Sequence, residues 1–257
     1  MRARRWRAAL VVAGTLLAAL PLEAAPVRVR FPEATTRGFL AIRAPDGRRI
    51  GHGELTQKTK GEEVESRLEL RFDDGSVHDE TTTFSQRGVF RLEASRLVQR
   101  GPSFPGTEAS FDRKTGRYQA TTHEKPGGPA ETANGEMDVP ADVYNGMALL
   151  LAKNLRAGET ASVQLAAFLP KPRLLRMEVR PEGEDRVVFG GAPKQATRFL
   201  VNLDIGGLTG VMASLLGKNP PDLRYWLVLG DVPAFVRFEG GMFLNGPVWR
   251  VEMAGLE

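Results

Sequence analysis

Most of this chain alternates apolar and polar residues at a period of two, and this pattern limits what it can fold into. Successive side chains of a strand point to opposite faces, so such a segment buries one face and leaves the other in water. The segment 63–72, EVESRLELRF, is a clear example, because Leu68, Leu70 and Phe72 lie on one face and charged residues lie on the other. The same alternation recurs in the segments 90–95, 160–167, 175–180, 198–204 and 249–253.

Turn-forming breaks separate many of these segments. They include PDG at 45–47, DDG at 73–75, SQRG at 85–88 and PEGED at 181–185. Glycine, proline and aspartate are typical of tight turns. Tight turns join antiparallel strands, whereas parallel strands need long crossover connections that are usually helical. We therefore expect a mainly β protein with an antiparallel meander, and a parallel α/β fold is disfavoured.

One segment departs from the strand pattern and predicts a helix over about 140–157. Apolar residues recur there at three- and four-residue steps, Pro140 stands in the first turn, and Gly158 follows the last. A curved sheet or half-barrel wrapped around this helix would cover the apolar sides of both. The polar stretch 124–138 has the composition of a linker, but the strands on either side of it lack a partner layer of their own. We therefore predict a single domain over 25–257.

A shorter apolar segment over 208–216 is flanked by glycines. Its pattern fits either a short helix or an irregular loop, and the sequence leaves both open. Because glycine permits hinge motion, we expect this segment to be a candidate lid over a bound ligand.

The first residues predict a secretory signal peptide over 1–24. Four arginines precede an apolar run of about fifteen residues that ends at Leu22, whereas a membrane span needs roughly twenty. We expect a periplasmic protein with no integral membrane span after cleavage. Removal of this segment takes away four Arg and one Glu and lowers the net charge from +4 to about +1, which gives no support for nucleic-acid binding. The chain has no cysteine, which excludes disulfides and a lipidated N-terminal cysteine.

The stretch RFDDGSVHDETTTF, at 71–84, combines four carboxylates with a histidine. The aspartate–glycine pair within 73–75 is a hairpin signal, because glycine tolerates positive φ and aspartate bonds its own backbone. A two-residue loop would turn Asp79 towards the sheet interior, whereas a three-residue loop would turn His78 and Glu80 there. The sequence leaves both registers open.

A metal or acid/base site is the other interpretation of this stretch. Metal sites need three or four converging ligands, but neighbouring strand residues such as His78 and Asp79 point to opposite faces. The chain also lacks the motifs of a nucleophile elbow, a zinc-binding helix and a phosphate-binding loop. We therefore expect a hairpin with a solvated polar face, no catalytic residue, no metal and no cofactor. A hydrolase or metal-dependent enzyme is the minor alternative.

Aromatic residues cluster in the last third of the chain, within 221–253. Most such residues form core, but an aromatic and aliphatic lining is also typical of apolar ligand sites. The motif DVYNGM at 142–147 and the series YW, DVPxFV and GPVWRVE within 225–252 are similar to those of uncharacterised exported bacterial domains. Those domains resemble the half-barrel of the lipoprotein-localisation carriers.

This resemblance covers about residues 37–257. It implies a curved antiparallel sheet around a helix, with an apolar concave face that the carriers use for acyl chains. It transfers no functional residue, and the chain lacks the lipidated cysteine of the outer-membrane acceptor type.

Together these observations predict a noncatalytic periplasmic protein that binds an apolar ligand, a lipid or acyl chain, on the concave face of a half-barrel. The alternative is an envelope assembly protein that acts through a protein partner, which we expect if the sheet closes fully on its helix. The candidate ligand-binding residues are Met147, Leu151, Phe199, Trp226 and Trp249.

Overall fold

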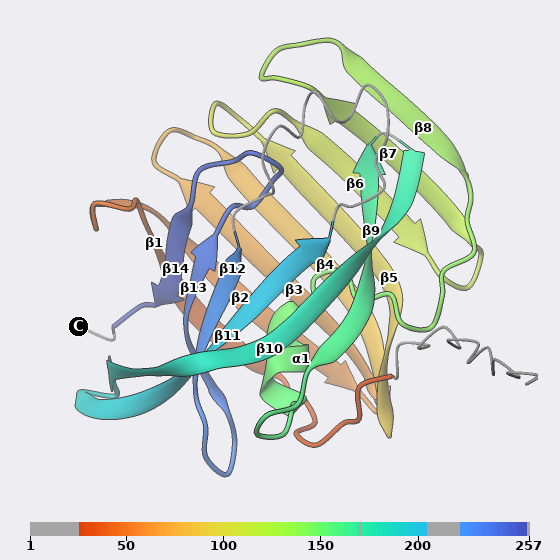
Figure 1. Ribbon diagram of the computed structural model, residues 1–257. Coiled ribbons are helices and arrows are strands. Elements are labelled where there is room, and N and C mark those ends of the chain that lie inside the picture. The colour runs from red at the N-terminus through yellow and green to blue at the C-terminus, as the bar shows by residue number, and fades with distance from the viewer. Residues whose placement is uncertain (1–25, 170, 205–221, 256–257) are drawn as a thin grey trace, which may run out of the picture.

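One large antiparallel sheet contains every named strand of the protein. The computed structural model describes residues 26–169, 171–204 and 222–255. The sheet has fourteen strands in the order β8-β7-β6-β5-β4-β3-β2-β1-β14-β13-β12-β11-β10-β9. It curves around a helix, α1 (Ala148–Asn154), without closing into a barrel (Figure 1). The expected mainly β fold with a curved antiparallel sheet is confirmed.

The strands form two meanders that flank the helix in the sequence. The first consists of β1 (Thr36–Arg43), β2 (Arg49–Lys60), β3 (Glu63–Phe72), β4 (Val77–Arg87), β5 (Val89–Arg100), β6 (Thr107–Asp112), β7 (Arg117–His123) and β8 (Ala130–Glu136). The second consists of β9 (Ala161–Leu169), β10 (Lys171–Phe189), β11 (Ala192–Asp204), β12 (Leu223–Val228), β13 (Ala234–Gly240) and β14 (Trp249–Met253).

The two meanders join through the first and last strands. β1 pairs with β14 in the register Leu40↔Met253 and Ile42↔Val251, and Figure 1 shows the two strands side by side. Neither strand is at an edge of the sheet, because β2 and β13 lie on their other sides. The sheet edges are therefore β8 and β9, which precede and follow the helix. The stretch predicted to be a linker contains the edge strand β8, whose residues are almost all exposed.

The helix is shorter than predicted. We expected it over about 140–157, but α1 covers Ala148–Asn154, so the expectation of a long helix was wrong. The chain turns at Gly146, which has a φ of 67°. Val143 forms an isolated parallel β-bridge with Gln164 of β9. There the amide of Gln164 donates to the carbonyl of Asp142, and the amide of Tyr144 donates to the carbonyl of Gln164.

Two clusters of buried residues lie on the face of the sheet that carries α1, which we call the inner face. The first, the helix cluster, packs α1 against both meanders and includes Val64, Phe84, Leu151, Val179 and Phe199. The second, the end cluster, includes Leu40, Leu70, Phe72, Phe104 and Trp249. A third, the outer cluster, consists of Ala196, Trp226 and Val236.

The predicted signal peptide and the apolar segment 208–216 lie outside the described residues. Within the described ranges, no helix has the length and apolar character needed to cross a membrane.

Candidate functional site on the inner face

The polar stretch 71–84 forms the hairpin that the sequence predicts, with the three-residue loop. The amide of Gly75 donates to the carbonyl of Phe72, and the amide of Phe72 donates to the carbonyl of Ser76. Asp74 accepts hydrogen bonds from the amide of Ser76 and from the hydroxyl of Ser103, so turn chemistry explains this carboxylate.

This register turns His78 and Glu80 to the inner face. His78 pairs with Leu70 and Glu80 pairs with Leu68, both of which lie on that face. His78 is only 6% exposed. The expectation of a solvated face was therefore wrong for these two residues, although Asp73 and Asp74 at the tip are exposed as expected.

Glu80 is the one charged residue in a row that crosses eight strands. Cross-strand partners share a face of the sheet, so the pairings trace this row across the inner face from β1 to β8. We call it the Glu80 row, and it consists of Gly38, Leu55, Leu68, Glu80, Leu97, Ala109, Ala120 and Ala133.

The carboxyl group of Glu80 has no hydrogen-bond partner among the described residues. Nε2 of His78 lies 4.0 Å from Oε2, which is too far for a hydrogen bond. The exposed fraction of the Glu80 side chain is 24%. Burial among apolar neighbours disfavours the ionised form and raises the pKa of Glu80 to about 7.

Gly146 brings the turn before α1 against this carboxyl group. A Cβ at Gly146 would lie 2.3 Å from Oγ1 of Thr82 and 3.0 Å from Oε1 of Glu80. The close approach and the positive φ both require glycine at this position.

His78 is held in one orientation and one tautomer by Gln99. The side-chain nitrogen of Gln99 donates to the carbonyl of Met242 at 2.7 Å and lies 3.0 Å from Nδ1 of His78. That nitrogen has two hydrogens, so Nδ1 accepts the second one and the ring carries its proton on Nε2, towards Glu80. Burial lowers the pKa of His78 to about 4, so the ring is neutral at pH 7.

Tyr225 lies on the inner face in the other meander. It belongs to a row on the inner face that includes Phe199, Tyr225, Phe238 and Val251. Burial raises the pKa of Tyr225, and the negative charge of Glu80 raises it further. The Tyr225 hydroxyl has no hydrogen-bond partner among the described residues either.

These residues form a surface between the helix cluster and the end cluster. Its side chains are partly exposed, unlike the closely packed residues of the two clusters. We call this surface the middle band, and it consists of Leu55, Leu68, Glu80, Leu97, Tyr225, Phe235 and Phe238. Phe235 packs against both clusters and so links them.

The structure brings together three of the five candidate ligand-binding residues. Met147, Leu151 and Phe199 lie in the helix cluster, each no more than 2% exposed. Trp249 also lies on the inner face, but in the end cluster. Trp226 lies on the opposite face, because it pairs with Arg198 while Phe199 pairs with Tyr225. The five residues therefore do not share one surface.

The environment of Trp226 is polar on one side. Its indole nitrogen donates to Asp185 at 2.7 Å, and the guanidinium carbon of Arg237 lies 4.0 Å from the ring centroid. This arrangement, together with its packing against Val236 in the outer cluster, fixes the side chain.

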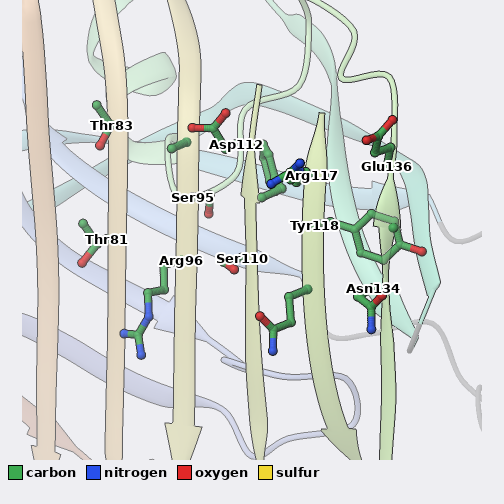
Figure 2. Close-up of a pocket in the computed structure, with 14 residues that line it drawn as sticks. Thr81, Thr83, Ser95, Arg96, Ser110, Asp112, Arg117, Tyr118, Asn134 and Glu136 are labelled. Carbon is green, nitrogen blue, oxygen red and sulfur yellow. The ribbon is translucent and has the colours of Figure 1, made fainter. Parts of the chain in front are cut away.

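A pocket of about 590 Å³ lies on the outer face of β4 to β8. Figure 2 shows Thr81, Arg96, Asp112 and Arg117 among the side chains along it. Arg96 also pairs with Glu108 on this face. The hydroxyl, amide and charged side chains of both signs around it are typical of a solvated sheet face.

Across the described ranges, no group of three or more histidine, aspartate and glutamate side chains is placed to hold a metal ion. No protein-family model matches the sequence, and comparisons with curated proteins and with solved structures found no match either.

Proposed function

We propose that this protein is an exported, noncatalytic binding protein that holds an apolar ligand, a lipid or an acyl chain, on the middle band of its inner face. The observation that carries this proposal is the partial exposure of Leu55, Leu68, Leu97 and Phe238 on the concave side of the sheet. These apolar side chains are partly exposed between two packed clusters. Covering them with another apolar surface removes them from water and lowers the free energy.

The position of the ligand differs from the one that the sequence favours. Met147, Leu151 and Phe199 pack against one another beside the helix and offer no surface. The inner face is partly uncovered farther along the strands, at the middle band. We therefore place the ligand there and not beside α1.

Native mass spectrometry of the protein purified from a periplasmic extract tests this proposal. We expect a copurifying lipid with the wild-type protein. Leu97→Trp fills the middle band and should remove that adduct. Val98→Trp is the matched control, since Val98 is the next residue of β5 and points to the outer face, where it pairs with Asp79 and Glu108. This control should keep the adduct.

Two results would contradict ligand binding. The first is a consistently empty spectrum when lipid is added at several concentrations. The second is an adduct that survives in Leu97→Trp and in the control alike. An empty spectrum together with a specific crosslink to one envelope protein in cells would support the assembly role instead.

A further inference from the structure

We propose that Glu80 and Tyr225 recognise a positively charged amino group on the ligand, so that the ligand is a cationic amphiphile. This inference rests on the proposed function and adds the chemical class of the ligand's polar end. It starts from two polar groups on the inner face, the Glu80 carboxyl and the Tyr225 hydroxyl, and neither has a hydrogen-bond partner among the described residues.

None of the described residues around Glu80 provides a positive charge that would balance its carboxylate. Its cross-strand neighbours are Leu68 on β3 and Leu97 on β5, and Gly146 lies against it from the turn before α1. The titratable groups that face it are His78 on its own strand and Tyr225 on β12. Neither carries a positive charge at neutral pH, because burial keeps the His78 ring neutral. A buried carboxylate without a partner is costly, and a bound cation removes that cost.

The sign of the ligand's charge follows from the residues around this site. Four rows of the inner face contain no lysine or arginine. They are the Glu80 row, the two rows beside it, which run through Thr82 and through His78, and the Tyr225 row. A phosphate or carboxylate head group would therefore meet a negative charge with no cation beside it. An ammonium group would instead donate to the Glu80 carboxylate and lie beside the Tyr225 ring, and its hydrocarbon part would cover the middle band.

Isothermal titration calorimetry with three ten-carbon probes tests this inference. The probes are decylamine, decanol and decanoate, which share a chain and differ in the charge of the head group. At pH 8.5 Glu80 is ionised, and an alkylammonium, like lysine, keeps its proton. We expect decylamine to bind the wild-type protein roughly tenfold more tightly than decanol, the amount typical of one charge-assisted hydrogen bond. Decanoate should bind most weakly.

Two variants separate the role of Glu80 from that of charge in general. Glu80→Gln keeps the shape and removes the negative charge, so decylamine should lose its roughly tenfold advantage over decanol. Glu108→Gln makes the same change on the outer face, where Glu108 pairs with Arg96, and should keep the wild-type order. At pH 5.5, where Glu80 is mostly protonated, the wild-type protein should behave like Glu80→Gln.

The outcomes distinguish this inference from the function on which it rests. If the three probes bind equally and Glu80→Gln changes nothing, the ligand site stands and the assignment of its charge is wrong. Tighter binding of decanoate than of decylamine would also overturn the assignment. If no probe binds, the proposed function itself fails.

Discussion

Glu80 and His78 occupy neighbouring positions on one face of β4, and burial moves their pKa values in opposite directions. The pKa of Glu80 rises from 4.5 to about 7, so between these values the folded protein binds more protons at this site than the unfolded chain. The free energy of unfolding therefore falls as the pH rises through that window. The pKa of His78 falls from 6.5 to about 4, and there the unfolded chain binds more protons, so the free energy of unfolding rises with pH.

We predict that these two effects largely cancel between about pH 4.5 and 6.5 in the wild-type protein. Glu80→Gln removes one of them, so its free energy of unfolding should rise with pH across this window by up to about 1.4 kcal/mol per pH unit. Urea denaturation at a series of pH values measures this slope. Parallel pH profiles for the variant and the wild-type protein would show that Glu80 is not held in a desolvated state.

The contact of Gly146 with Thr82 and Glu80 gives a second prediction at this scale. Gly146→Ala should destabilise the protein by about 1–3 kcal/mol more than Gly61→Ala, because the added Cβ would overlap Oγ1 of Thr82. Gly61 is a suitable control, since its φ of 64° is close to the 67° of Gly146 and a Cβ there meets nothing within 4 Å. Equal losses in thermal unfolding would mean that only the backbone conformation matters at Gly146.

At the scale of elements, the segment before α1 shows where sequence reasoning fails. The apolar spacing through Val143 and Met147 fits a helix, but the pair Asn145-Gly146 between them is a turn signal that the prediction overlooked. Before this turn, Val143 instead pairs with the edge strand β9, a tertiary role that periodicity along the chain does not reveal. The opposite holds for the strands, because their period of two reports local burial directly and so predicts them well.

The side chain of Asn145 attaches this segment to β9 through two hydrogen bonds to the backbone of Ala166, as a paired strand residue would. Its Nδ2 donates to the carbonyl of Ala166 at 2.8 Å, and its Oδ1 accepts from the amide of Ala166 at 2.9 Å. We predict that Asn145→Ala lowers the free energy of unfolding by about 1–3 kcal/mol, since both groups of Ala166 lose their partner. Asn134→Ala on the exposed edge strand β8 should change stability by no more than about 0.5 kcal/mol. Chemical denaturation compares the two, and equal effects would contradict the fastening role.

The candidate site could be predicted only in part, for a related reason. Alternation along one strand assigns Trp226 and Tyr225 to opposite faces but does not say which face is inner. That assignment depends on cross-strand register, which the irregularity between Trp226 and Leu227 also shifts. For the same reason, the sequence allows two registers for the hairpin at 71–84. Only the register with the three-residue loop turns Glu80 to the inner face.

At the scale of the whole molecule, the pairing of β1 with β14, which we call the seam, places the first and last named strands in the interior of the sheet. Each of them has a hydrogen-bonded neighbour on both sides, whereas β8 has one neighbour and is almost wholly exposed. We predict that amides of β1 and β14 exchange with solvent among the slowest in the protein and those of β8 among the fastest, because local opening is easiest at exposed edges. Hydrogen exchange with mass spectrometry measures this, and fast exchange in β1 would contradict the central position of the seam.

The seam also lies beyond what the sequence predicts. Within each meander every strand pairs with the next one along the chain, as sequential strands usually do. The pairing of β1 with β14 joins segments at opposite ends of the chain, and no local pattern in either strand encodes it.

The order of the strands also has a consequence for biosynthesis. Among the named strands β14 is made last, so a chain that folds before β14 is available leaves one edge of β1 unpaired. Such an edge invites pairing with other unfinished chains. Folding that begins only once β14 is available avoids this exposed edge.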